Sequence, residues 1–170
     1  MTVADEFRVI LRERAARLSR PLDELPKDLT RVVIFNVGRE LYGMEIVHVL
    51  EICRPESVTY VPGAESYIEG VTNLRGEIVA VADLKSLLTG EPRNKKEKRG
   101  GMILAEIMGK KLGMLVTGID GIYDIQSGSI DPPLNTLEKL KAEHLVGEFM
   151  FRDRIVGLLN AVAVLGIKGT

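Results

Sequence analysis

Residues 35–44, FNVGRELYGM, recur in altered form as AEIMGKKLGM at residues 105–114, and this repetition decides the fold that the sequence predicts. A second group of matches lies further along the chain, where each residue recurs 77 positions later. The matched pairs are Gly70 and Gly147, Arg75 and Arg152, Ile78 and Ile155, and Val79 and Val156. Because both groups occur in the same order, they indicate an internal duplication, and we expect two related structural units.

Short segments rich in valine and isoleucine predict β-strands in both halves. The expected strands are residues 31–37, 40–44, 48–54 and 76–81 in the first half, and 102–108, 111–117, 121–125 and 154–160 in the second. Gly38 and Arg39 suit a tight hairpin turn between the first two strands, and residues 118–121 suit a turn later in the chain. Short helical structure is expected at residues 83–88, and a short helix or an ordered loop at 136–144.

A sheet of about five short strands must close on itself or pair with another sheet to protect its edges. Two small β-barrels packed face to face would bury a core that neither could build alone. The first barrel is expected at about residues 31–90 with a closing C-terminal segment, and the second at about 100–160. A single β-sandwich is the less favoured alternative, because a charged stretch at residues 91–101, typical of a solvated linker, separates the halves.

The N-terminal region carries a helical pattern instead of a β pattern. At residues 4–19, Phe7, Ile10, Leu11 and Leu18 fall on one side of a predicted helix, with arginines elsewhere. Pro21 ends this helix, and residues 22–30 form a tether. Residues 1–30 are therefore expected to extend a domain at residues 31–168. The helix either docks on its own domain, which we favour, or binds a partner.

Composition favours a cytoplasmic protein without nucleic-acid affinity. The net charge is −1, and aromatic residues make up 5% of the chain with no tryptophan, which argues against nucleic acid and anionic membranes as direct partners. The one cysteine, Cys53, cannot form an internal disulfide and suits a reducing compartment. The charged opening residues do not resemble a secretory signal.

Catalytic and metal-binding patterns are absent from the sequence. The two histidines, His48 and His144, lack a further ligand at metal-binding spacing. Gly101, Gly109 and Lys110 do not have the spacing of a phosphate-binding loop, and no Gly-x-Ser-x-Gly turn occurs. We therefore expect no metal, no cofactor and no enzymatic activity, so that binding to other proteins is the function left by elimination.

One polar interruption stands out in an apolar context. Asn73, Arg75 and Gly76 break the strand pattern within residues 70–84. Asparagine and glycine permit a tight bend, and an arginine there can present a planar set of donors to a carboxylate or a carbonyl. The alternative is a bulged turn that carries a solvated arginine.

This interruption also carries a resemblance to a known family. The stretch GVTNLRG at residues 70–76, followed by Ile78-Val79 and Asp83-Leu84, resembles the signature of CheW coupling proteins. Residues 37–46, 49–52 and 60–63 upstream are similar to the same family. Further matches in the second half extend the resemblance over roughly residues 31–165.

The resemblance implies a mainly β fold of two five-stranded Src-homology-3-like barrels packed around a shared core. It also implies an adaptor in bacterial chemotaxis that binds the signalling tips of methyl-accepting chemoreceptors and the regulatory domain of the histidine kinase CheA. Such a protein is cytoplasmic and reaches the membrane only through receptor arrays. The alternatives are an adaptor of a kinase pathway unrelated to motility, and a small-molecule-binding sensor on the same fold.

The resemblance also assigns partner-binding roles to particular residues. The arginine of the signature and two residues of the third strand fall on Arg75, Glu51 and Val49, and Asn73 and Gly76 belong to the same signature. Weaker candidates in the second half are Met102, Ile119 and Ile122. Several of these could instead be core residues, above all Val49. The sequence departs from the family pattern at Ala80 and Ala82, and at Val164-Leu165-Gly166 it does not show the family's usual terminal helix with an acidic start.

Overall fold

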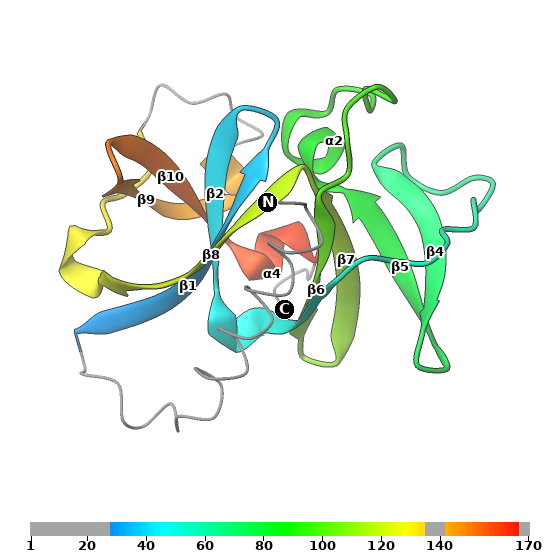
Figure 1. Cartoon of the computed structure of the whole chain (residues 1–170), viewed down its shortest axis with the longest axis horizontal. Helices are drawn as coiled ribbons and strands as arrows, with labels where there is room; N and C mark the ends of the chain where they lie inside the picture. Colours follow the sequence, from blue (N-terminus) through cyan, green and yellow to red (C-terminus); the bar gives the residue numbers. More distant parts are fainter. Residues whose placement is uncertain (1–27, 135–141, 167–170) are drawn as a thin grey trace, which may run out of the picture.

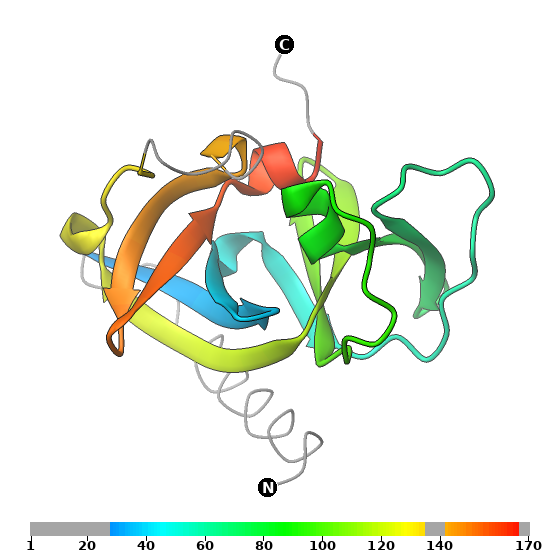
Figure 2. The same ribbon diagram turned by 90° about the horizontal axis from the view of Figure 1, so that it is seen from above.

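The computed structural model describes residues 28–134 and 142–166. Within these ranges the fold is mainly β, with two five-stranded sheets that lie side by side (Figures 1 and 2). The predicted helix at residues 4–19 lies outside the described residues, as does most of the segment predicted at 136–144. No helix in the described ranges is long and apolar enough to cross a membrane.

Each sheet combines strands from both halves of the chain. The first has the order β8-β1-β2-β10-β9, and the second has the order β3-β6-β7-β5-β4. The strands of the first sheet are β1 (Leu29–Val37), β2 (Glu40–Glu45), β8 (Gly118–Gln126), β9 (Leu145–Phe151) and β10 (Arg154–Leu159). Those of the second are β3 (Val49–Cys53), β4 (Ile68–Leu74), β5 (Glu77–Asp83), β6 (Gly101–Ile107) and β7 (Lys110–Val116).

The sheets therefore do not follow the predicted division at about residues 31–90 and 100–160. The first hairpin of each half joins the sheet formed by the rest of the other half. Two parallel ladders make this exchange: Val81 pairs with Gly113 between β5 and β7, and Val156 pairs with Leu41 between β10 and β2. The strands β1 to β5 correspond in order to β6 to β10. Exchanging each strand for its counterpart converts one sheet order into the other, so the topology also shows the duplication.

The main core lies between the sheets. Val33 and Phe35 of β1 point into it, while Val32 and Ile34 point to the opposite face, where a smaller cluster lies within the first sheet. Since side chains alternate between faces along a strand, burial on both faces explains the continuous apolar run of β1. A third cluster of Val81, Met102 and Leu115 lies within the second sheet in the same way.

The short helices also correspond between the halves. Helix α2 (Leu84–Thr89) follows β5, close to the predicted residues 83–88, and α4 (Ala161–Val164) follows β10. Asp83 caps α2 by accepting a hydrogen bond from the Ser86 amide at 2.9 Å, and Asn160 caps α4 by accepting one from the Ala163 amide at 3.3 Å. Two 3-10 turns complete the described elements, η2 (Ile46–His48) and η3 (Ser127–Ser129).

Three strand predictions need correction. β4 and β9 were not predicted, because Gly70 and Gly147 interrupt their apolar alternation. Residues 118–121 were predicted as a turn but form the start of β8. There the ladder with β1 shifts register between Ile34 and Phe35, so the glycines accommodate an irregular strand instead of a turn.

Candidate partner-binding site

A two-residue turn holds the centre of the predicted site. Arg75 and Gly76 connect β4 to β5, and both have positive φ angles, of 53° and 82°. This geometry matches the twist of a tight hairpin and favours glycine at the second position. The Asn73 side chain accepts a hydrogen bond from the Gly76 amide at 2.8 Å. Asn73 and Gly76 therefore fix the turn that carries Arg75 outward.

Arg75 contacts the predicted residue on the third strand. Its Nη2 lies 3.1 Å from Oε1 of Glu51, and the Arg75 side chain stays 82% exposed. Glu51 is on β3 and the turn follows β4, so the ion pair joins the two edge strands of the second sheet. An exposed pair of this kind contributes about 0.2–1 kcal/mol. We call Glu51, Asn73, Arg75 and Gly76 the Arg75 site.

The other predicted residues lie in the interior. Val49 is 6% exposed, Ile122 is 1% exposed, and the half-buried Ile119 packs against the same shared core. Met102 is fully buried in the cluster within the second sheet. In this conformation these side chains can influence a partner only through the packing of the sheets that support the surface.

The sequence did not predict three exposed apolar residues on β5, on β3 and on the turn η2 that precedes β3. Ile78 is 66% exposed and pairs directly with Asn73 across the β4–β5 ladder. Val47 of η2 and Leu50 of β3 are 58% and 43% exposed. Alternation from the buried Val79 could have placed Ile78 outward. For Val47 and Leu50 no such signal exists, because the 3-10 turn breaks the period.

The second half has a counterpart of the Arg75 site. Arg152 and Asp153 form the turn between β9 and β10, again with positive φ angles, of 47° and 61°. The Arg152 guanidinium lies 3.7 Å from Asp120 of β8 and 4.8 Å from the centre of the Phe151 ring. It also donates a hydrogen bond of 3.3 Å to the Tyr123 hydroxyl. We call this group the Arg152 site.

Tyr123 of the Arg152 site has an altered acidity. Burial raises the pKa of its hydroxyl, and the 2.6 Å hydrogen bond that it donates to Asp120 raises that pKa further. The neutral phenol therefore remains a hydrogen-bond donor over the physiological range. Like the Arg75 pair, these contacts join a turn after one edge strand of the sheet to the opposite edge strand, β8.

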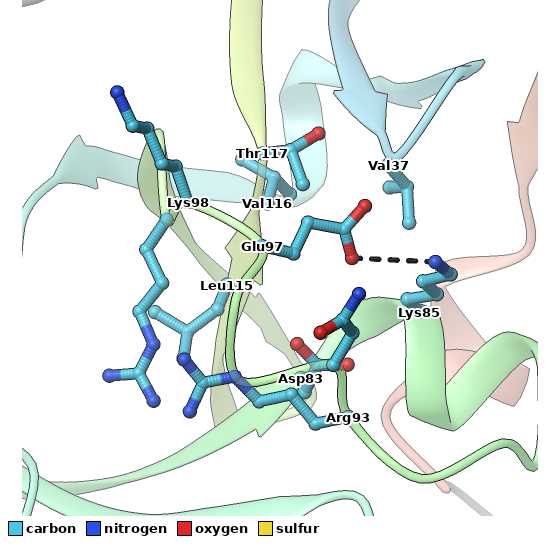
Figure 3. A pocket seen from close by; sticks show the side chains of 11 residues that line it. Val37, Asp83, Lys85, Arg93, Glu97, Lys98, Leu115, Val116 and Thr117 are labelled. Carbon is cyan, nitrogen blue, oxygen red and sulfur yellow. Dashed lines mark hydrogen bonds and ion pairs between the residues drawn. The ribbon is translucent and has the colours of Figure 1, made fainter.

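The charged stretch at residues 91–101, predicted as a solvated linker, is held to the sheets and to α2 by ion pairs. Arg93 and Arg99 both donate to the Glu69 carboxylate, at 2.7 and 2.6 Å, and Lys85 of α2 lies 3.4 Å from Glu97. Figure 3 shows the pocket that Lys85, Arg93 and Glu97 line together with neighbouring residues. Its free volume of about 20 Å³ has room for about one water molecule and not for a ligand.

Metal ligands do not gather anywhere in the described ranges, where no three histidine, cysteine, aspartate or glutamate side chains could hold one ion. Cys53 is half-buried on β3. The chemistry that the site offers is therefore hydrogen bonding and ion pairing by Arg75 and Glu51, next to exposed apolar side chains.

Comparisons with known proteins identify the family. The family model described as the CheW-like domain matches residues 31–168. The chain belongs to the CheW-like family. The family match, the chemotaxis proteins among its relatives and a similar scaffolding protein of known structure support a chemotaxis coupling adaptor.

Individual relatives cover most of the chain. It is 29% identical to the chemotaxis protein CheW of Treponema pallidum over 69% of this chain and 71% of that protein. It is 34% identical to the protein FrzA of Myxococcus xanthus over 74% of this chain and 79% of that protein. The crystal structure of the scaffolding protein TtCheW from Thermoanaerobacter tengcongensis matches with a TM-score of 0.71 and 29% identity, over 83% of this chain and 95% of that one.

Proposed function

We propose that this CheW-like protein couples methyl-accepting chemoreceptors to the histidine kinase CheA by binding the receptor signalling tips and the kinase regulatory domain. The observation that carries the proposal is the family match across residues 31–168. It works in the cytoplasm and joins membrane-bound arrays through the receptors. It transmits the receptor state through protein contacts and needs no cofactor.

The Arg75 site is the surface through which we expect the kinase or the receptor to be recognised. The Arg75 guanidinium is mostly exposed, so its remaining donors can bind a carboxylate or a carbonyl of a partner. Its ion pair with Glu51 is weak enough to be exchanged for a partner's group on binding. The exposed Ile78 beside Asn73 supplies apolar contact area.

We also infer that each sheet curls into a Src-homology-3-like barrel, within a coupling unit at residues 31–168. The segment after β3 returns to β4, where Thr59 and Val71 exchange two backbone hydrogen bonds of 2.8 and 2.9 Å. The segment after β8 does the same, with Asp131 and Glu148 exchanging two bonds of 2.8 Å. The Arg75 and Arg152 contacts support closure at the same edges.

Co-sedimentation with receptor fragments and kinase, with autophosphorylation as a second readout, tests the proposal. Arg75→Ala and Glu51→Lys should each weaken partner binding by about tenfold or more, while the free energy of unfolding falls by no more than about 1 kcal/mol. Arg39→Ala, at the exposed turn between β1 and β2, is the matched control and should bind as the wild type does. The assignment fails if both site variants retain full binding and full kinase activation, and the coupling function fails if the wild type neither sediments with receptors nor alters kinase activity.

A further inference from the structure

An exposed apolar surface lies where β2 passes into β3. Val47 and Leu50 are 58% and 43% exposed, and they stand three residues apart across the 3-10 turn η2. Val47 lies in the turn itself, and Leu50 is the bulged residue of β3, since its neighbours Val49 and Glu51 pair with the adjacent residues Ala105 and Leu104. Glu45 precedes the turn and forms no ion pair with another residue of the described ranges. We call Glu45, Val47 and Leu50 the η2–β3 surface.

The N-terminal segment has a complementary pattern. A helix over residues 4–19 would place Phe7, Leu11 and Leu18 in one stripe. Arg14 falls within this stripe, three residues after Leu11 and four before Leu18. An arginine inside an apolar contact requires an acidic partner. The η2–β3 surface offers two apolar side chains and one carboxylate, which match this stripe in chemistry.

The connection between segment and surface is short enough. Val32 pairs with Glu45 in the β1–β2 ladder, so the chain enters the described structure at Asp28, four residues before a position beside the η2–β3 surface. Four residues of strand span about 13 Å. The eight residues from 20 to 27 can span about 26–29 Å when extended. The segment at residues 4–19 can therefore reach this surface without strain in the tether.

We propose that residues 4–19 dock as an amphipathic helix on the η2–β3 surface of their own chain, with Leu11 against Leu50 and Arg14 paired with Glu45. The helix covers a surface that includes a direct neighbour of Glu51 in the sequence. A helical partner that used the same apolar side chains would have to displace it. This consequence rests on the proposed function, whereas the docking itself does not.

Disulfide trapping in the full chain tests the docking. In a Cys53→Ser background, Leu11→Cys with Leu50→Cys should form an intramolecular disulfide under oxidised glutathione about tenfold faster than Leu11→Cys with Ile155→Cys. Ile155 is a matched control because it is 54% exposed on the other sheet. Ala16→Cys, on the opposite side of the predicted helix, should also react slowly with Leu50→Cys. Equal rates, or faster reaction at Ile155, would overturn the docking.

A charge swap tests the register of the contact. Arg14→Glu should slow the Leu11–Leu50 trapping reaction several-fold, and Arg14→Glu with Glu45→Arg should restore most of the rate. If the swap does not restore it, the Arg14–Glu45 pair is wrong. In hydrogen exchange of the otherwise wild-type chain, Leu11→Asp should speed exchange at residues 46–53, whereas Ala16→Asp should not. Identical exchange in both variants would also contradict the docking.

The same variants separate this inference from the proposed function. If the helix competes with a partner, Leu11→Asp should raise affinity for receptor fragments several-fold over Ala16→Asp. Trapping needs no partner, so a failed trapping reaction leaves the coupling function intact. A chain that traps efficiently but binds neither receptors nor kinase would contradict the coupling function alone.

Discussion

Arg75 and Arg152 occupy equivalent turn positions, yet their surroundings differ. Arg75 has one ion pair and is 82% exposed, whereas Arg152 contacts Asp120, Tyr123 and the Phe151 ring. The guanidinium of Arg152 is thus held by aromatic and acidic groups together, and that of Arg75 can exchange partners. At the residue scale, duplication preserved a structural position while its chemistry diverged.

Gly70 carries a backbone contact that no other residue type can make. A Cβ at this position would overlap the carbonyl oxygen of Thr59, and its φ is +147°. Gly70→Ala should therefore lower the free energy of unfolding by about 3 kcal/mol, measured by urea denaturation. Gly63→Ala is the control, because Gly63 also has a positive φ, of +76°, but no atom near its Cβ position. Gly63→Ala should lower the free energy of unfolding by only about 1 kcal/mol. Equal costs would show that backbone strain alone is responsible.

Tyr42 links stability to alkaline pH. Burial raises the pKa of its hydroxyl well above the usual range of a tyrosine, and the 2.7 Å hydrogen bond that it donates to Glu40 raises that pKa further. The folded state then keeps a proton that the unfolded state loses above pH about 10, so stability should fall as pH rises beyond that value. Urea titrations between pH 8 and 11 should show this slope reduced in Tyr42→Phe. An unchanged slope would contradict the assignment.

At the scale of elements, the hairpin turns and the connecting stretch are tied to neighbouring strands by side chains. Glu69 at the start of β4 accepts from both Arg93 and Arg99 and is 19% exposed. Because one carboxylate binds two cations, it orders a stretch that composition alone would leave solvated. This stretch joins α2 to β6 and hence the two halves.

Removing this carboxylate charge should loosen the connection. Glu69→Gln should lower the free energy of unfolding by about 1–2 kcal/mol, because two partly buried ion pairs are lost. Limited trypsin digestion should then cut at Lys95, Lys96 or Lys98 several-fold faster than in the wild type. Glu97→Gln, which loses only the 3.4 Å contact with Lys85, is the control and should be cut at nearly the wild-type rate. Equal protection of Glu69→Gln and the wild type would rule out anchoring by Glu69.

At the scale of the whole molecule, the exchange of hairpins makes the two sheets mutually dependent. β6 and β7 lie between β3 and β5, and β1 and β2 lie between β8 and β10. Neither half can complete a sheet, and the shared core draws side chains from both sheets and both helices. A change in side-chain packing at one sheet can therefore alter the packing of the other sheet through the shared core.

Separated halves provide the corresponding test. Fragments 1–98 and 99–170 should each lack cooperative unfolding. The first fragment lacks β6 and β7, which pair with its β3 and β5, and the second lacks β1 and β2, which pair with its β8 and β10. Mixed or co-expressed, they should assemble with circular dichroism and an unfolding transition close to those of the intact chain. If either fragment folds alone with a cooperative transition, the exchanged topology is wrong.

The sequence by itself determined the β class, the duplication and the Arg75 turn, since each depends on local signals. Valine and isoleucine runs specify strands, and Asn73 and Gly76 specify a hairpin turn whose geometry needs no distant contact. β4 and β9 were not predicted because each contains a glycine, Gly70 or Gly147, that interrupts the strand pattern. Glycine is needed there because the backbone of Thr59 or Asp131, distant in sequence, passes too close for a Cβ atom.

Only the tertiary structure decided which hairpin joins which sheet and which predicted site residues reach the surface. The parallel ladders pair Val81 with Gly113 and Val156 with Leu41, and such pairings leave no periodic mark in either strand. Met102 and Ile122 were candidates by position in the family pattern, but Met102 packs in the cluster within the second sheet and Ile122 in the core between the sheets, so neither side chain reaches the surface. The contact between Arg75 and Glu51 likewise joins the β4–β5 turn to β3, which are far apart in the strand order of the second sheet, so it depends on the tertiary structure.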